Sequence, residues 1–495
     1  MKKCFKIVVL STLILATLAF SCGALSNESS YMYDGYNESY AAPVAYVADR
    51  IVSGYDIGTT TLNSPSDIYV SRDNELYIVD TRNNRIVITD ENFKFVREIK
   101  EYIENGESKT LNNPKGVYKG YDDYIYICDT DNKQIVVLDE NNNLIRKDAG
   151  EDIVAVNKNI EFKPEKIVMD RERTIYVVDP NIYQGIIQYD SELNFQSFYS
   201  TNEVIVTAAV RLRNLWRQFF DEETANEYMQ QELPAPYNNI FMSHDDFAYT
   251  TATGVAIGDE IKCINALGKN ILITPQTELG QVSYGDLEVS YEGTTQITSN
   301  FVDVHCDERG VISALDQKRG RIFQYDKECN LVCIFGGIGT NKGSFTNPVS
   351  IEKLGDNYIV LDADTNSITV FKATDYINDV YEALDYYNKG LYEDSVELWK
   401  NVLRQNNSYT TAYKSVGRAY LQQGYYKEAM DILEKGNDQY FYSMALKEYR
   451  KEFTRKNMWW MVILVVAVLA GFVSGVKRLK CWLLSKPYVK KRKKG

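Results

Sequence analysis

The sequence contains few of the residues on which metal and acid–base chemistry most often depend. Its 495 residues include two histidines, His244 and His305, and eight cysteines. Three of the cysteines lie near the chain ends, and the other five show no paired spacing typical of a zinc site. No P-loop, dinucleotide-binding or nucleophile motif occurs in a matching strand–turn–helix context. These absences predict buried free thiols, no metal, no cofactor and no identifiable catalytic residue.

Basic residues are scarce between the two ends of the chain. The formal net charge is −13. Three lysines precede residue 7, and nine lysines or arginines follow Val476, with no acid in either segment. The body between them is therefore more acidic than the total suggests. Because binding to phosphate groups needs a basic face, we expect no nucleic-acid partner.

Long apolar runs are confined to the two ends. Residues 1–24 combine a basic start, an apolar run over 7–20 and small residues after it, as in a secretory signal peptide. Cleavage could follow Ser21 or Ala24, and Cys22 leaves a lipoprotein alternative open. We expect the domains that follow to lie outside the cell.

The second apolar run, 458–476, carries no charge and begins with an aromatic pair typical of a membrane interface. The basic segment 477–495 after it is a stop-transfer signal and predicts a cytoplasmic tail. A basic cluster between Lys447 and Lys456 flanks the other side and weakens the charge bias. The sequence predicts a single-pass protein of the cell membrane with its N-terminal domains extracellular.

Five segments of the body repeat one pattern. Each begins with proline or an equivalent residue, continues through a short strand and a second strand that ends in aspartate, and turns into a β-branched third strand. The second-strand aspartates are Asp80, Asp129, Asp179, Asp316 and Asp362. Neighbouring repeats are about 46–50 residues apart, which suits four-stranded propeller blades. The same turn in every blade needs the same capping residue, so we interpret these aspartates as structural.

These repeats resemble the NHL-repeat family over residues 45–373. The resemblance implies an all-β fold, a six-bladed β-propeller, and says little about chemistry because such folds host many functions. We place the sixth, degenerate blade at 241–274, with Thr251 where the aspartate should be and a fourth strand starting at Asn270. Residues 49–54 resemble the outer strand of a blade, so they are expected to complete the last blade and close the ring.

Two insertions interrupt the pattern: an amphipathic helical segment at about 203–231 and a polar hairpin at about 280–299. Irregular loops on a rigid scaffold often carry function. Trp216, Phe219 and Phe220 of the helical insertion are therefore candidate binding residues. The alternative is that they only pack the insertion onto the propeller.

Residues 374–456 show a 34-residue period of small and large residues similar to the tetratricopeptide repeat, which predicts a small α-helical domain. Its last helix, 440–457, is expected to run directly into the membrane. Residues 25–44 are rich in Ser, Asn and Tyr without periodicity, which indicates a flexible linker.

The first strands of the blades supply the other candidates. Asp67, Lys166 and Asp303 are expected near one end of the central channel and are candidate binding residues, although Lys166 is unfavourable for a calcium cage. His305 occupies the position held by Tyr69 in another blade, which favours a structural role. His244 is expected at the surface.

Together these patterns favour a bacterial, membrane-anchored binding or scaffold protein that is not an enzyme. The resemblance implies an ABC transporter component as a partner and carbohydrate as a conceivable ligand, because proteins with these modules accompany such transporters. An extracellular lactonase or lyase is the alternative. Metal-binding side chains converging in the channel would favour the enzyme, whereas a plugged channel would favour binding.

Overall fold

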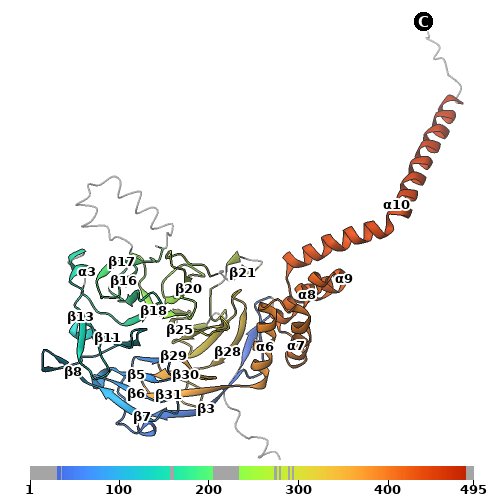
Figure 1. Ribbon diagram of the computed structural model, residues 1–495. Coiled ribbons are helices and arrows are strands. Elements are labelled where there is room, and N and C mark those ends of the chain that lie inside the picture. The colour runs from blue at the N-terminus through green and yellow to red at the C-terminus, as the bar shows by residue number, and fades with distance from the viewer. Residues whose placement is uncertain are drawn as a thin grey trace, which may run out of the picture. The chain divides into compact units, whose positions relative to one another are not determined.

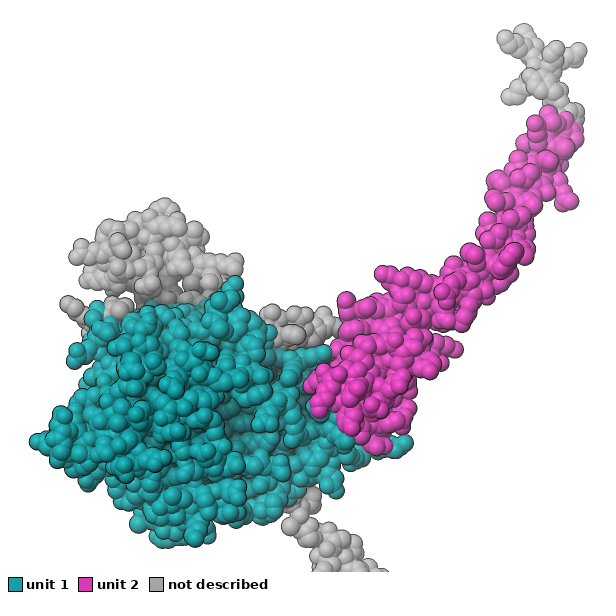
Figure 2. All heavy atoms as spheres, viewed as in Figure 1, with its two compact units in different colours: residues 1–385, 404–407 teal, residues 386–403, 408–495 magenta. Residues whose placement is uncertain are grey.

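The computed structural model describes residues 30–34, 36–156, 161–203, 233–272, 276–277, 280–281, 283–287, 290–292 and 295–485. The predicted signal peptide, the predicted aromatic anchors Trp216, Phe219 and Phe220, and the end of the predicted tail lie outside the described residues. The chain divides into two compact units (Figure 2). Unit 1 comprises residues 1–385 and 404–407, and unit 2 comprises residues 386–403 and 408–495.

Unit 1 contains a six-bladed β-propeller, as predicted, and Figure 1 shows its strands. Blade 1 comprises β4 (Asp67–Val70), β5 (Leu76–Asp80), β6 (Arg85–Thr89) and β7 (Phe95–Ile99). Blade 2 comprises β10 (Gly116–Lys119), β11 (Ile125–Asp129), β12 (Gln134–Leu138) and β13 (Leu144–Asp148). Blade 3 comprises β14 (Lys166–Met169), β15 (Ile175–Val178), β16 (Ile186–Tyr189) and β17 (Phe195–Tyr199). Blade 4 comprises β18 (Tyr237–Met242), β19 (Ala248–Ala252) and β20 (Ile261–Ile264). Blade 5 comprises β25 (Phe301–Cys306), β26 (Ile312–Asp316), β27 (Arg321–Tyr325) and β28 (Leu331–Gly336). Blade 6 comprises β29 (Pro348–Leu354), β30 (Asn357–Asp362), β31 (Ser367–Ala373) and β3 (Tyr46–Ser53).

The first strand of each blade contacts the first strand of the next, and β29 returns to β4, so the ring is closed. The second strands are buried on both faces because neighbouring blades cover each sheet. In β5, for example, all five residues are buried, and one hydrophobic cluster joins Tyr77 and Val79 of blade 1 to Val117 and Ile125 of blade 2. This explains the continuous β-branched runs of the repeat.

The predicted closing strand is confirmed. β3 is the fourth strand of blade 6 and pairs antiparallel with β31, from Tyr46 opposite Ala373 to Ser53 opposite Ser367. The edge of β31 is thereby hydrogen-bonded to β3 from the start of the propeller, so blade 6 has no unpaired edge at the junction.

The repeated aspartates hold the loops that lead into each blade. Asp80 Oδ1 accepts a hydrogen bond from the backbone N–H of Asn63 at 2.7 Å, and Asp129 Oδ1 accepts one from Asn112 at the same distance. The other three make the equivalent bond to a backbone N–H about 16 residues upstream. Their shared position therefore reflects a shared loop.

Blade 4 departs from the prediction in three ways. It begins at Tyr237, before the expected residue 241. Only an isolated bridge between Ile264 and Asn270 stands where the fourth strand was expected. The pair of Met242 and Ala248 in blade 4 is equivalent to the pair of Val70 and Leu76 in blade 1. Asp80 lies four residues after Leu76, so its equivalent in blade 4 is Ala252 rather than the expected Thr251. Blade 4 lacks the turn aspartate that marks the register of the other five blades, so the sequence alone leaves its register open.

Smaller elements surround the blades. The expected hairpin at 280–299 is instead two short ones, β21 (Gln276–Thr277) with β22 (Gly280–Gln281) and β23 (Ser290–Glu292) with β24 (Thr295–Ile297). A further hairpin joins β8 (Glu101–Glu104) to β9 (Glu107–Thr110). The short helices are α2 (Gly54–Ile57), α3 (Glu151–Val156), η1 (Thr81–Asn83) and η2 (Thr130–Asn132).

The segment expected to be a flexible linker is ordered over most of its described part. β1 (Tyr31–Tyr33) and β2 (Ser39–Ala41) form a hairpin, and the Met32 side chain is buried. The Arg321 guanidinium lies 4.5 Å from the centre of the Tyr31 ring, and Tyr33 hydrogen-bonds Asp286. The linker prediction was wrong here because these tyrosines find partners far away in the sequence.

The helices after the propeller are α6 (Asp375–Asn388), α7 (Tyr392–Gln405), α8 (Thr410–Gln423), α9 (Tyr426–Lys435) and α10 (Gln439–Leu484). Within unit 2, Gly417 lets α8 approach α9, because a Cβ there would lie 2.5 Å from Leu433 Cγ. α10 continues without interruption into the apolar segment, where an 18-residue window has a mean hydropathy of 2.3 and none of it is buried. By length and composition, α10 contains one candidate membrane span.

Candidate ligand pocket in the propeller channel

The first strands of the six blades place two rings of residues around the channel, two residues apart along each strand. Because side chains alternate along a strand, residues at these two positions share a face. The pairing registers identify equivalent positions in every blade. The plug layer comprises Asp67, Gly116, Lys166, Asn239, Asp303 and Ser350. The pocket layer comprises Tyr69, Tyr118, Val168, Phe241, His305 and Glu352.

The plug layer contains all three channel residues predicted from the sequence, and the structure brings them together. Lys166 Nζ of blade 3 donates to Asp67 Oδ1 of blade 1 at 2.5 Å, and Ser350 Oγ of blade 6 donates to the same oxygen at 3.0 Å. The Asn239 amide of blade 4 donates to Asp303 of blade 5, whose other oxygen accepts from the Ile351 backbone N–H at 2.7 Å. This network links five blades across the channel. A role in ligand binding stays a prediction for Asp67, Lys166 and Asp303.

The electrostatics of the plug layer are those of a shared buried charge. Burial raises the pKa of Asp67 and raises the pKa of Asp303 to about 6. Burial alone would lower the pKa of Lys166, but the carboxylates of Asp67 and Asp303 outweigh it and raise that pKa. One ammonium group therefore pairs with Asp67 and is also attracted by Asp303, while burial opposes ionisation of both carboxyl groups.

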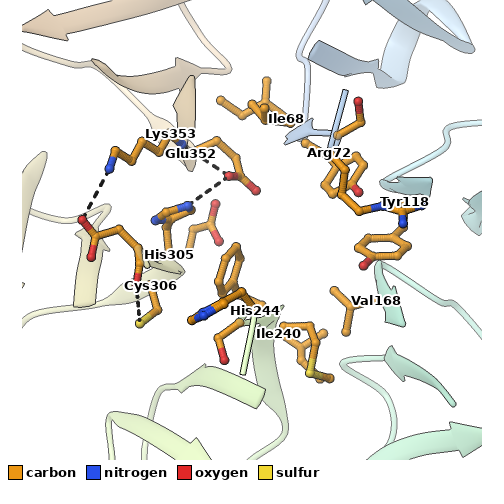
Figure 3. Close-up of a pocket in the computed structure, with 18 of the residues that line it drawn as sticks. Ile68, Arg72, Tyr118, Val168, Ile240, His244, His305, Cys306, Glu352 and Lys353 are labelled. Atoms are coloured by element: carbon orange, nitrogen blue, oxygen red, sulfur yellow. Dashed lines mark hydrogen bonds and ion pairs between the residues drawn. The ribbon is translucent and has the colours of Figure 1, made fainter. Parts of the chain in front are cut away.

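A cavity of about 630 Å³ lies next to the plug layer, on the side of the pocket layer. Residues of all six blades line it (Figure 3). It opens where the first strands end, because exposed residues of the following turns, such as Arg72 and Arg309, also line it. The cavity is thus a pocket with a polar floor, the plug layer, and a mouth at one face of the ring.

The pocket layer has an aromatic and apolar side and a polar side. The Tyr69 and Tyr118 rings lie 4.8 Å apart, and the Phe241 ring lies 4.6 Å from the ring of His305. His305 Nε2 is 3.6 Å from Glu352 Oε2. Aromatic surface therefore adjoins an imidazole–carboxyl pair in one continuous belt.

Both members of this pair resist charge. Burial lowers the pKa of His305 to about 4. Burial also raises the pKa of Glu352 well above its usual range, and the carboxylates of Asp303 and Asp67 raise it further. Their separation is within ion-pair range, but the two shifts oppose ionisation of either group. We therefore describe the contact as one between a neutral imidazole and a neutral carboxylic acid at neutral pH.

The cations at the mouth already have partners. Arg72 donates to the Gly120 carbonyl oxygen at 2.8 Å and lies 4.3 Å from the centre of the Tyr121 ring. Lys353 Nζ is 3.4 Å from Asp307 Oδ2. Arg309 lies 4.8 Å from the centre of the Tyr381 ring. His244 is exposed, as expected, and its Nε2 lies 3.1 Å from Asp245.

Sequence reasoning placed His305 in a structural role and did not identify Glu352. The signal that could have found the pair is the repeat itself. Aligning the first strands puts both residues at the position of Tyr69, where a channel-facing side chain is required. Among the described residues, no group of three or more His, Cys, Asp or Glu side chains is arranged to hold a metal ion.

Comparison with known proteins supports the repeat. Residues 62–88 match the NHL repeat family. No curated protein matches the chain. Similar solved structures include the virginiamycin B lyase from Staphylococcus aureus, with 10% identity and a TM-score of 0.39, covering 66% of this chain and 100% of that one.

Two other structures are similar to a comparable degree. The PQQ-bound aldose sugar dehydrogenase from Streptomyces coelicolor has 12% identity and a TM-score of 0.38, covering 67% of this chain and 98% of that one. The extracellular domain of a protein from B. thetaiotaomicron, described as a hybrid two component system, has 11% identity and a TM-score of 0.38, covering 69% and 37%. At this level of similarity, none of their activities transfers to this chain.

Proposed function

We propose that this protein is a membrane-anchored binding protein whose propeller, outside the cell, takes a ligand into the channel pocket. One observation carries the proposal: the channel is plugged. The plug layer joins five blades through groups that contact one another, whereas the pocket layer two residues away surrounds an open cavity of about 630 Å³. A plugged channel with one mouth suits retention of a ligand better than passage through the ring.

Anchoring and orientation rest on the ends of the chain. α10 contains the candidate span, the basic residues after Val476 favour a cytoplasmic tail, and residues 1–24 resemble a signal peptide. The test is protease added to intact cells. It should digest the propeller and spare a tag on the tail, and a protected propeller would contradict the orientation.

The binding site is tested by filling the pocket. Val168 lines it and is buried, so Val168→Trp should place an indole in the cavity. The detergent-solubilised full chain is incubated with an extract of growth medium, recovered, and analysed for retained compounds by mass spectrometry. We expect compounds that the parent retains and the variant loses. The matched control is Val96→Trp on β7, where the valine is exposed. Identical retention by both variants would contradict the pocket as the site.

A protein partner remains part of the proposal. The helical repeats, which we regard as tetratricopeptide-like, would dock a membrane partner such as a component of an ABC transporter. The 34-residue period and the close approach of α8 and α9 at Gly417 support the interpretation as helical repeats. Cross-linking in intact cells, with and without residues 386–435, tests whether a partner depends on these helices.

The alternative is an extracellular enzyme of lactonase or lyase type, and the pair of His305 and Glu352 favours it. A buried imidazole beside a carboxyl group can accept and return a proton. Under this alternative, compounds retained from the medium should be converted over time by the parent chain and remain unchanged with His305→Ala. Under the binding proposal, the parent itself returns them unchanged.

A further inference from the structure

We propose that the ligand of the channel pocket carries a positively charged amino group, held by the carboxyl group of Glu352. This inference rests on the proposed function, since it names the ligand class of the same pocket. It is carried by three features of the channel: its imbalance of charge, the position of Glu352, and the aromatic side chains of the pocket layer.

The channel contains more acidic than basic groups. Four buried carboxyl groups line the cavity: Asp307 is paired with Lys353, whereas those of Asp67, Asp303 and Glu352 accompany one ammonium group, that of Lys166. The ammonium is committed to Asp67 in the plug layer. A buried charge without a partner is costly, so at least one carboxyl group must stay protonated in the empty channel. A cationic ligand supplies the missing charge.

Glu352 is the carboxyl group placed to meet that ligand. Its residue is 8% exposed, and its carboxyl group points toward the open centre of the cavity (Figure 3). Oε2 accepts a weak hydrogen bond from the Lys353 backbone N–H at 3.4 Å and lies 3.6 Å from His305 Nε2. No hydrogen bond within the described part of the chain involves Oε1. The Glu352 carboxyl group faces the open cavity, so Oε1 is placed to accept a hydrogen bond from a ligand there.

The surrounding groups favour a cation over an anion. Tyr69, Tyr118 and Phe241 belong to the same layer, and aromatic faces attract ammonium groups, more strongly when water is excluded. The mouth cations have partners of their own, while Glu308 and Asp356 at the mouth are exposed. An anionic ligand would face the carboxyl groups of Glu352, Asp67 and Asp303 with only Lys166 below.

Binding of a cation is expected to release a proton. The ligand favours the carboxylate form of Glu352, whereas the empty pocket favours the acid, so affinity should rise with pH. The titratable or charged groups that face Glu352 are Asp67, Tyr69, Lys166, Asp303, His305 and Lys353. His305 stays neutral above about pH 4 and adds no competing charge at neutral pH.

The test compares a cation with a neutral molecule of the same shape. Benzylamine and benzyl alcohol are titrated into the full chain in detergent by calorimetry. We expect benzylamine to bind at least about tenfold more tightly at neutral pH, and more tightly still as pH rises. Glu352→Gln should remove this preference. The substituted amide resembles the protonated acid, so the variant should fold, and its melting temperature verifies this. Glu308→Gln at the mouth is the matched control and should keep the preference.

Each outcome decides the proposal. Equal binding of the two probes that is lost with Val168→Trp would overturn the amine and leave the pocket as the site. No binding of benzylamine, or an unchanged preference in Glu352→Gln, would also overturn it. A peptide source of the amino group is distinguished from a small amine by titrating tetra-alanine with a free and with an acetylated amino terminus. Tighter binding of the free form than of benzylamine would identify a peptide end.

Discussion

The plug layer and the pocket layer lie on the same six strands, two residues apart. The polar groups of the plug layer contact one another, whereas those of the pocket layer face an open cavity. In the plug layer, the polar groups of five blades meet one another: Lys166 reaches Asp67, and Asp303 is held from two sides. In the pocket layer, His305 Nδ1 is buried without a hydrogen-bond partner, and the Glu352 carboxyl group faces the open cavity. The difference teaches that buried charge alone does not identify a binding site. A site is indicated where buried polar groups also line an open cavity, as in the pocket layer.

The largest effect should follow from removing the cation of the plug layer. Lys166→Met leaves two buried carboxyl groups with no ammonium between them, which should lower the free energy of unfolding by about 3–5 kcal/mol. Urea unfolding of the detergent-solubilised chain measures it. Lys115→Met, at a more exposed ion pair with Glu165, is the control and should cost less than about 1 kcal/mol. Equal losses would remove the distinction between the layer and an ordinary surface pair.

A smaller effect is expected from pH acting on Asp303. Its pKa is 3.8 in an ordinary setting and about 6 in the folded protein. Between these values the unfolded chain is ionised at this residue and the folded chain is not. Stability should therefore fall as pH rises through this window, by roughly 2–3 kcal/mol from this group.

Asp303→Asn removes the titrating group, so the difference in unfolding free energy between parent and variant should change between about pH 4 and 6 and stay level above it. Chemical unfolding at several pH values measures this difference. A constant difference across the window would show that Asp303 is already ionised in the folded plug.

The smallest loss of stability should come from the pocket layer. Glu352→Gln replaces a neutral acid with a neutral amide, so at about pH 4 its unfolding free energy should stay within about 1 kcal/mol of the parent value. At higher pH the unfolding free energy of the variant should exceed that of the parent. Glu352 ionises in the unfolded parent but not in the folded parent, which lowers the stability of the parent alone. A large destabilisation at low pH would mean that Glu352 belongs to the scaffold, as Lys166 does.

A structural feature could be predicted from the sequence where the contacts that determine it recur in every blade. The period of about 50 residues predicted the blades, the closing strand and the channel position of Asp67, Lys166 and Asp303, because each blade repeats the same local solution. Blade 4 lacks the turn aspartate, and its register was predicted one residue off. The hairpin of Tyr31 and Tyr33 was missed because its contacts with Arg321 and Asp286 are specific to one place. The repeat places His305 and Glu352 at equivalent positions of two blades, but the contact between their side chains depends on the distance between those blades, which the sequence does not give.

The unbroken course of α10 has a mechanical consequence for the helical unit. Between Gln439 and the start of the apolar segment at Met458, the helix rises about 28 Å with no glycine or proline to interrupt it. Its early residues pack on α8 and α9, and its later residues form the candidate span. A tilt or rotation of the candidate span would therefore be passed along one continuous helix to the residues that pack on α8 and α9.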